Sequence, residues 1–455
     1  MSETDELPNG WELVELNDVS TITSSKRIFQ DEYVSNGIPF YRTKEVKELS
    51  EGKSITNNLF ISDEKYNEIK SRFAIPQKGD VLLSAVGTIG ISYVIKNDNP
   101  FYFKDGNLMW FKDLNYISSY FLSYGLTNFI RNGTGAKTSG SAYNALTIET
   151  MSRFLFPIPP LPEQHRIVSK IEELFSSLDK GVESLKTARK QLKVYRQSVL
   201  KWAFEGKLTN CYSIEWIKLG ALCENVEYGS ATKSKDSGTT PVLRMGNIQN
   251  GVFDWDDLVY TSDEVEIKKY LLQKGDVLFN RTNSPEWVGK TAIYKGERPA
   301  IFAGYLIRIN YLKDKLNPSY LNYFLNSQTA KNHGNSVKSF GVNQSNINGT
   351  KLKEYPFPIC SLAEQQAIVS EIESRLSVCD KIEESITQSL LQAEALRQSI
   401  LKKAFEGKLV PQDPSDEPAS VLLERIKAER EKNIVAPKAK KVKKSRQTEI
   451  TFETV

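Results

Sequence analysis

The sequence predicts an α+β protein in which two α/β heads are separated by two long antiparallel coiled-coil helices, related by an internal pseudo-two-fold repeat. The first observation behind this prediction is a duplication. The stretch that starts at Leu161 returns 201 positions later, at Leu362, without a gap, and 24 of 46 positions are identical when residues 163–208 are aligned with residues 364–409. The second observation is an apolar spacing of 3.5 residues in each copy, which is typical of a coiled coil. The third is that matching short patterns precede both copies.

Each copy of the duplicated stretch predicts one long helix. Apolar residues in the first copy follow each other by alternating steps of four and three; they are Ile167, Ile171, Leu174, Leu178, Gly181, Leu185, Ala188, Leu192, Tyr195, Val199 and Trp202. The second copy keeps a weaker stripe, which we expect to need the first helix as partner; it consists of Ile368, Ile372, Ile382, Ile386, Ala393, Leu396 and Ile400, with Arg375, Ser389 and Lys403 at the remaining positions. Pro162 suits a first helical position, and Gly206 and Gly407 suit left-handed stops.

The direction of the helix pair follows from lengths. A helix of about 44 residues is roughly 65 Å long. The roughly 150 residues that join the two helices have a diameter of about 40 Å if they are compact. Such a domain cannot connect the far end of one helix to the near end of a parallel partner. We therefore expect an antiparallel rod that acts as a spacer with one head at each end, and the opposite net charges of the two helices favour this pairing.

The two heads share a framework of short patterns. In chain order, the first three pairs predict a short strand with a helical turn at Trp11 and Ile214, a strand leading into a polar loop at Ile38 and Thr240, and a glycine turn of positive φ with a buried strand at Gln77 and Gln273. The next three predict an amphipathic helix at Ile117 and Asn317, a glycine-containing polar loop at Asn132 and His333, and a proline-rich extended strip at Phe156 and Tyr355. The loops that follow the buried strands, AVGTIG and RTNSPEWVG, differ entirely. A shared framework with divergent loops is what two recognition tasks on one scaffold would produce.

Composition sets limits on the class of protein. At 455 residues and 40% hydrophobic, the chain can bury two ordinary cores. No run approaches 18 apolar residues, and MSETDELPNG lacks the pattern of a signal peptide, so we expect a soluble, cytoplasmic protein with no membrane partner. The net charge of +4 does not by itself indicate nucleic acid. A zinc site has poor support because no CxxC pair is present; we expect reduced, packed cysteines at Cys211, Cys223, Cys360 and Cys379.

No pattern supplies a catalytic centre or a cofactor site. The fragment SPEWVGKT approaches a P-loop but has Ser284 where the first glycine is required. The DWDD cluster around Asp254 lacks the spacing of an EF-hand, and the triplet from Glu266 to Lys268 does not make a nuclease. No glycine-rich SAM loop or NPPF-like motif occurs, and His165 and His333 belong to no paired motif. We therefore expect no catalytic residue, no metal and no cofactor in this chain.

The tail has three parts. An acidic, turn-rich segment, VPQDPSDEPAS, follows Leu409; a short amphipathic helix is expected in SVLLERIKAEREK; and a basic run starts at Pro437. We expect the basic run to be disordered, either merely solvated or in nonspecific contact with phosphates. The predicted division of the chain is 1–160 for the first head, 161–208 for the first spacer helix, 209–360 for the second head, 361–410 for the second spacer helix and 411–455 for the tail.

With these features in view, the chain resembles the specificity subunit of type I restriction-modification enzymes. The resemblance covers nearly the full length and rests on the order head, helix, head, helix, on PLPEQ and SLAEQ before the helices, on RQSVLKWAFEGKL and RQSILKKAFEGKL at their ends, and on LVPQDPSDEPAS after the second. Ala363 stands where the first copy has Pro162. The resemblance implies two target-recognition domains, each reading one half of an asymmetric bipartite site in double-stranded DNA, and helices that dock two modification (methyltransferase) subunits. It also implies that SAM, ATP, Mg²⁺ and the chemistry of adenine methylation and cleavage belong to the modification and restriction subunits.

Polar residues near the shared strands are the candidates for DNA contact. Those able to pair with base edges are Arg42, Thr43, Lys44, Arg244, Asn247, Gln249, Asn280, Arg281 and Asn283. Those suited to phosphates and groove walls are Lys26, Arg27, Lys137, Thr138, Lys233, Lys235 and Lys338. For each residue the alternative is a loop side chain that is only solvated.

Our leading hypothesis is a noncatalytic DNA-specificity subunit. A coiled-coil scaffold whose two heads bind proteins is the alternative from another class, and a stand-alone DNA enzyme is the third. The repeated helix alone does not separate the first two. If the rod sets the spacing of the heads, half-site centres should lie about 10 bp apart or a small multiple of that distance, because positions one helical turn apart present the same groove face.

Overall fold

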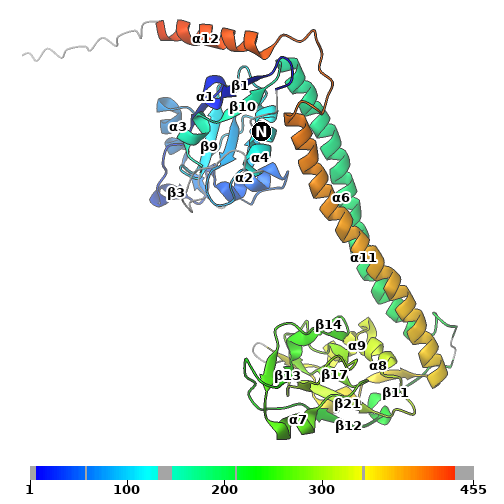
Figure 1. Ribbon diagram of the computed structural model, residues 1–455. Coiled ribbons are helices and arrows are strands. Elements are labelled where there is room, and N and C mark those ends of the chain that lie inside the picture. Colours follow the sequence, from blue (N-terminus) through cyan, green and yellow to red (C-terminus); the bar gives the residue numbers. More distant parts are fainter. Residues whose placement is uncertain (1–6, 57–58, 132–145, 211–212, 341–343, 436–455) are drawn as a thin grey trace, which may run out of the picture. The chain divides into compact units, whose positions relative to one another are not determined.

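The computed structural model describes residues 7–56, 59–131, 146–210, 213–340 and 344–435. The chain divides into two compact units, of which unit 1 comprises Met1–Val182 and Leu391–Val455 and unit 2 comprises Glu183–Leu390. Two helices of 44 residues, α6 (Leu161–Phe204) and α11 (Leu362–Phe405), contribute residues to both units (Figure 1). Each unit thus combines a head of mixed helices and strands with the beginning of one long helix and the end of the other, and the predicted fold class is confirmed.

Unit 1 carries the first head and the last described helix. Its elements besides the long helices are β1 (Glu12–Glu15), α1 (Leu16–Val19), β2 (Thr21–Thr23), η1 (Gln30–Glu32), β3 (Tyr33–Val34), β4 (Ile38–Tyr41), α2 (Thr43–Ser50), β5 (Phe60–Ile61), α3 (Asp63–Arg72), β6 (Val81–Ser84), β7 (Ser92–Val94), β8 (Tyr102–Phe103), β9 (Leu108–Lys112), α4 (Ser119–Arg131), α5 (Ile148–Ser152), β10 (Leu155–Ile158) and α12 (Ala419–Val435).

Unit 2 carries the second head. Its elements are β11 (Glu215–Lys218), η2 (Leu219–Leu222), β12 (Cys223–Tyr228), β13 (Thr240–Leu243), η3 (Met245–Asn247), β14 (Ile248–Gln249), β15 (Val252–Phe253), β16 (Val259–Thr261), α7 (Glu264–Tyr270), β17 (Val277–Asn280), β18 (Thr282–Asn283), β19 (Thr291–Ile293), β20 (Ile301–Phe302), β21 (Leu306–Tyr311), α8 (Pro318–Leu325), α9 (Gln328–Val337), β22 (Ser339–Phe340), β23 (Ser345–Asn346), α10 (Gly349–Lys353) and β24 (Pro356–Ile359).

The two heads repeat one strand framework. The main sheet has the order β2-β9-β6-β7 in unit 1 and β12-β21-β17-β19 in unit 2, with antiparallel neighbours in both. A parallel pair recurs as β4 with β8 and as β13 with β20. The strand at the start of each head pairs antiparallel with the proline-rich strip at its end, β1 with β10 and β11 with β24. The repetition seen in the sequence therefore extends to the topology of the heads.

The glycine turn before the buried strand was correctly predicted in both heads. Gly79 has a φ of 94° and Gly275 a φ of 96°, a region that favours glycine because residues with a Cβ are strained there. In both turns the following aspartate accepts a backbone N–H from the glutamine that opens the motif, at 2.9 Å. The strands after these turns, β6 and β17, are buried at every position.

Two predicted polar loops are partly helical. The segment after β4 forms α2 because the Glu45 carboxylate accepts both the backbone N–H of Arg42, at 2.9 Å, and the Arg42 guanidinium, which closes the first turn. The predicted loop from His333 instead begins inside α9, which extends to Val337. Gly334 does not break this helix; it is buried where an added Cβ would lie 2.6 Å from the Tyr355 hydroxyl, so close packing explains this glycine. The loop from Asn132 lies outside the described residues.

The signals at the helix ends are largely confirmed. Gly206 and Gly407 have φ values of 74° and 67°, directly after α6 and α11. Pro162 is the second residue of α6 rather than the first, a position that also lacks an intrahelical acceptor for its nitrogen. Asn317 caps α8 as predicted, because its side chain accepts the N–H groups of Ser319 and Tyr320. In the tail, α12 is the expected helix.

The buried stripe of each long helix differs in part from the predicted seam. Tyr195 and Trp202 of α6 are each 37% exposed, and Leu396 of α11 is 51% exposed. Charged residues that pair across the helices flank the stripe, with their acidic partners exposed. Arg196 donates to Asp380 at 2.6 Å within unit 2, and Arg397 pairs with Asp179 within unit 1. Such partly exposed pairs add contacts beside the apolar stripe, which the apolar count alone could not reveal. Gly181, Ile382 and Lys403 are likewise exposed rather than buried.

Contacts inside unit 2 show the antiparallel direction of the helix pair. Arg189 lies 3.6 Å from Glu383, and Arg196, one heptad later in α6, pairs with Glu383 at 3.1 Å and also with Asp380, three residues earlier in α11, at 2.6 Å. The pairing partner therefore moves backwards along α11 as α6 advances. The same direction follows in unit 1, which contains the first turns of α6 and the last turns of α11.

The end of each long helix is anchored in a head by a phenylalanine. Phe405 packs against Phe121, Phe129 and Phe156 in unit 1, with ring centroids 4.9, 5.4 and 6.1 Å away. The repeat-related Phe204 packs against Tyr320 and Phe324 in unit 2, at 5.1 and 5.2 Å. Burying such rings contributes about 1.5–3 kcal/mol each. The helix ends are thus part of the cores of the heads.

The segment after α11 completes unit 1. The backbone N–H of Ala419 donates to Gly10 O at 3.0 Å, and the Gln412 amide donates to Asn9 O at 2.9 Å. Arg166 pairs with Asp416 at 2.5 Å. Ala419 and Ile426 are buried in the same core as Phe405. None of the helices among the described residues is long and apolar enough to cross a membrane.

Candidate nucleic-acid interface

Several predicted base-reading residues instead hold the loops of their own head. Asn247 is only 3% exposed; its Oδ1 accepts the backbone N–H of Arg244 at 2.9 Å, and its amide donates to the carbonyls of Asp254 and Asp256. The Arg244 guanidinium donates to the carbonyl of Asp257 at 2.7 Å. In unit 1, Glu45 takes the place of Asn247 in the same turn. As placed, Asn247 supports the loop around Asp254 and does not present its amide to a ligand.

A second group fixes the loop after β17. Asn280 is fully buried, and its amide donates to Trp287 O at 3.3 Å. The Arg281 guanidinium donates to Gly304 O at 3.0 Å and stacks 4.8 Å from the Tyr228 ring centre. Asn283 accepts the N–H of the next residue at 2.8 Å. These side chains shape a loop that extends to Val288, and a buried Asn280 cannot reach a base edge in this conformation.

Most of the remaining predicted residues lie at the surface, whereas the Thr43 hydroxyl is buried; all of them stay predictions. Lys26 lies 4.4 Å over the Phe73 ring, and Arg27 is 69% exposed despite its pairing with Asp105 at 2.8 Å. Thr43 and Lys44 occupy the first turn of α2, where Lys44 is 65% exposed. Lys233 and Lys235 are exposed in the segment before β13. Lys137 and Thr138 lie outside the described residues.

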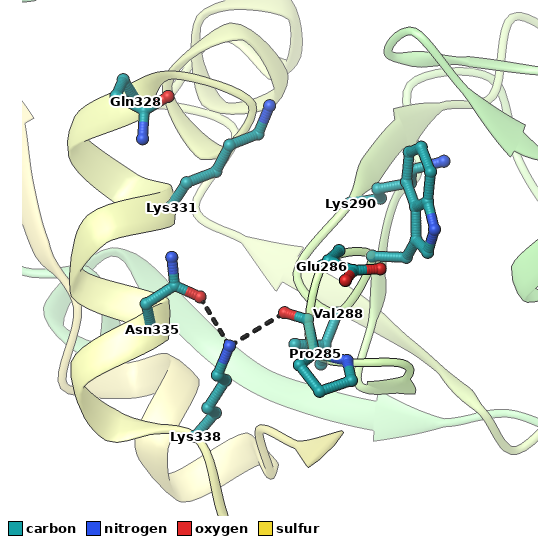
Figure 2. A pocket seen from close by; sticks show the side chains of 9 residues that line it. Pro285, Glu286, Val288, Lys290, Gln328, Lys331, Asn335 and Lys338 are labelled. Carbon is teal, nitrogen blue, oxygen red and sulfur yellow. Dashed lines mark hydrogen bonds between the residues drawn. The ribbon is translucent and has the colours of Figure 1, made fainter. Parts of the chain in front are cut away.

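A hollow in unit 2, which we call the lysine hollow, was not predicted. It has a volume of about 420 Å³ and lies between the loop after β17 and one face of α9 (Figure 2). Its lining residues are Pro285, Glu286, Trp287, Val288, Lys290, Gln328, Lys331, Asn335 and Lys338. Lys338, which sequence reasoning assigned to phosphates, donates to Pro285 O at 2.9 Å and to Asn335 Oδ1 at 2.8 Å, and so connects the two walls.

One sequence signal could have found this hollow. Gln328, Lys331, Asn335 and Lys338 follow each other at steps of three, four and three, which places four polar side chains on a single helical face. The prediction of a loop from His333 hid this pattern. Trp287 belongs to a loop that differs in length and sequence from its counterpart in the first head, and Lys290 stands where that head has Ile91, so the repeat gave no information about them.

Other chemistry-bearing groups are packed rather than assembled into a site. Burial raises the pKa of the Cys223 thiol to about 11, and Cys379 is buried between the long helices of unit 2. Burial lowers the pKa of His333, whose ring packs against Tyr355 at 4.6 Å. In the described parts of the chain, no three histidine, cysteine or acidic side chains gather closely enough to hold a metal ion.

Comparison with known proteins decides the family. The family model described as "Type I restriction modification DNA specificity domain" matches residues 8–192 and again residues 214–392. The chain belongs to this specificity family. Both matches begin near the start of a head and end within a long helix, so the family's repeated domain corresponds to the duplication described above.

Relatives and solved structures agree with this assignment. The type I specificity subunit EcoKI of Escherichia coli K12 is 29% identical over 334 residues, which are 69% of this chain and 72% of the relative. The StySPI specificity subunit of Salmonella potsdam is 30% identical over 335 residues, 70% of this chain and 72% of the relative.

Two solved structures share the fold of this specificity subunit. One comes from work on complex assembly and conformational transition of the type I R-M system; it matches with a TM-score of 0.69 at 20% identity and covers 89% of this chain and 100% of its own. The HsdS subunit from Thermoanaerobacter tengcongensis matches with a TM-score of 0.57 at 19% identity, covering 90% and 100%.

Proposed function

We propose that this specificity subunit is noncatalytic and reads an asymmetric, bipartite site in double-stranded DNA, with one half-site for each head. It directs adenine methylation by two modification subunits and cleavage by restriction subunits. SAM, ATP and Mg²⁺ are bound by those partners and not by this chain. The complex acts in the cytoplasm, where the DNA is.

One observation carries this proposal: the two heads share their strand order but differ in their loops. The backbone hydrogen bonds around the loop after the buried strand are the same, since Ser84 N donates to Ile91 O at 2.9 Å and Asn280 N donates to Lys290 O at 2.8 Å. Between these fixed points the first head has six residues and the second has nine. Loops on a rigid framework are where recognition residues concentrate, and two different loop sets favour two different half-sites.

The long helices offer a surface for the modification subunits. Apolar side chains that do not belong to the buried stripes remain exposed on them: Val194, Tyr195, Trp202, Val378, Ile382, Leu391 and Leu396. Exposed apolar groups on a helix favour burial against a partner. Tyr195 and Leu396 are related by the repeat, and both are exposed. Two such positions support two partners of one kind, bound in equivalent ways.

Exchange of one head tests the proposal. Residues 209–360 are replaced by the corresponding head of another specificity subunit, the variant is assembled with its modification subunits, and methylated sites are mapped by sequencing. We expect one half-site to change while the other half-site stays the same. If both half-sites or neither changed, the heads would not be independent readers. If the assembly bound no specific DNA while both heads were folded, the scaffold hypothesis would replace this one.

A further inference from the structure

The strongest feature that the function above leaves unexplained is a cation without a counterion. Lys331 extends from α9 along one wall of the lysine hollow (Figure 2). Within the described part of the chain its ammonium group makes no hydrogen bond and no ion pair. Surrounding protein atoms lower its pKa below the usual value for lysine, by burial alone and with no opposing carboxylate. The residue nevertheless remains accessible to solvent, so a ligand can reach it.

A second cation lines the same hollow. Burial lowers the pKa of Lys290, and the positive charge of Lys331 lowers it further. The Lys290 ammonium lies 3.8 Å over the Trp287 ring and donates to the neutral Gln249 Oε1 at 3.3 Å. Glu286 also lines the hollow but forms no ion pair with either lysine. Two partly buried cations that line one hollow repel each other, and an anion bound beside them would offset that repulsion.

The walls of the hollow are held in place for a ligand. The Lys338 ammonium donates to the backbone carbonyl of Pro285 and to the side-chain amide oxygen of Asn335, so that oxygen is already occupied. The amide nitrogen of Asn335 then remains as a neutral donor among the residues that line the hollow. Ammonium and amide donors that line one hollow suit an anion with several acceptor oxygens.

We propose that the lysine hollow binds one backbone phosphate of the DNA, through Lys331 and Lys290. This assignment rests on the proposed DNA-reading function. A DNA phosphate is favoured over a free anion because the hollow adjoins the loop that differs between the heads. It is particular to the second head, since Ile91 occupies the framework position of Lys290 in the first. A phosphate contact here fixes how the second head lies on the duplex and carries no base preference itself.

The first experiment measures salt dependence with the protein assembled with its modification subunits. Lys331→Gln and Lys290→Gln remove one positive charge each, and Lys268→Gln removes an exposed lysine of α7 as a matched control. Neutralising one phosphate contributes about 0.9 to the slope of log affinity against log salt. We expect each hollow variant to reduce that slope, the double variant to reduce it by about 0.9 in total, and each variant to weaken specific and nonspecific DNA about equally. Its methylated sequence should not change, and Lys268→Gln should behave as wild type.

A second experiment locates the phosphate. A series of duplexes, each with one neutral methylphosphonate within the half-site of the second head, is bound to the wild type and to Lys331→Gln. We expect one position to weaken the wild type about fivefold to tenfold, as the loss of one phosphate contact predicts at 0.15 M salt, and to have a clearly smaller effect on the variant, in which only Lys290 remains. Coupling at one position supports the proposal.

Three results would overturn it. In the first, the hollow variants keep the wild-type salt slope. In the second, no methylphosphonate position couples to Lys331. In the third, a titration with inorganic phosphate at fixed ionic strength shows that the variants have lost phosphate binding, while their DNA binding is unchanged. In each case the wild type would still bind and methylate its site, so the proposed function would stand. A wild-type assembly without sequence-specific binding would instead remove the proposed function itself.

Discussion

If modification subunits dock on the long helices as proposed, the exposed apolar side chains that the repeat places in equivalent positions should carry the binding. Leu396 is 51% exposed, and full burial of a leucine contributes about 1.5–3 kcal/mol, so covering its exposed half contributes about 1 kcal/mol. Leu396→Ala should therefore weaken docking about fivefold, since 1.4 kcal/mol corresponds to tenfold. Leu396→Glu places an unpaired carboxylate in the interface, which costs several kcal/mol, and should weaken docking by more than about 100-fold.

The assay is the stoichiometry of the assembly, measured by native mass spectrometry. We expect two modification subunits on the wild type, one on Leu396→Glu, one on Tyr195→Glu and none on the double variant. Lys402→Glu introduces the same side chain on α11 at a position that is 70% exposed on another face, and should leave both subunits bound. Thermal unfolding verifies that each variant remains folded. Two subunits bound with unchanged affinity to folded Leu396→Glu would refute the reasoning.

Four further predictions concern stability, spacing and chemistry. Lys331→Met should raise the melting temperature at pH 7, because the pKa of Lys331 is lowered in the folded state and its charged form therefore destabilises the fold below that pKa. The free energy of unfolding of the wild type should increase as pH rises toward the ordinary pKa of lysine, whereas that of the variant should not. Gly181→Ala, with open space around it on a helix, should stabilise by about 1 kcal/mol, whereas Gly334→Ala should destabilise in the same denaturant titration because its Cβ has no room. One heptad inserted near Ser184 and another near Ser385 should widen the unread gap by about three base pairs, as mapped by methylation, because seven helical residues add roughly 10 Å; altered bases within a block would contradict a spacer role. The purified chain with SAM and DNA should transfer no methyl groups, and incorporation of labelled methyl without a partner would contradict this.

Local signals in the sequence were sufficient for much of the fold. The turns at Gly79 and Gly275, the cap at Asn317 and the helix stops at Gly206 and Gly407 are each determined by a few neighbouring residues, and all were predicted. The duplication then gave the order of the elements, because the same order of short patterns in both halves of the chain excludes most alternative assignments of helices and strands.

Features that depend on contacts between residues far apart in the chain could not be predicted from the sequence. Gly334 looks like a helix breaker until Tyr355, distant in the sequence, is placed against it. Arg196 looks like a surface charge until the antiparallel pairing brings Asp380 to it. The seam was therefore assigned partly to the wrong residues, although the helices themselves were correct.

The candidate site was the least predictable part. An asparagine that caps a loop and an asparagine that reads a base have the same side chain, so Asn247 and Asn280 could be assigned only after their burial was known. Lys290 and Lys331 come from a loop and a helix that the sequence separates by 41 positions. Their proximity is a property of the fold, and only the polar stripe on α9 was visible beforehand.

The anchoring of Phe405 has a consequence for the order in which the nascent protein can fold. Residues 183–390 are contiguous, so unit 2 can close as it leaves the ribosome. Unit 1 cannot, because the aromatic surface around Phe121 and Phe156 is completed only by Phe405, which is synthesised roughly 250 residues later. At about 5–20 residues per second that delay is on the order of 10–50 s. During this interval the aromatic rings of the first head are without the cover of Phe405, and we expect truncation before α11 ends to leave a head that aggregates more readily.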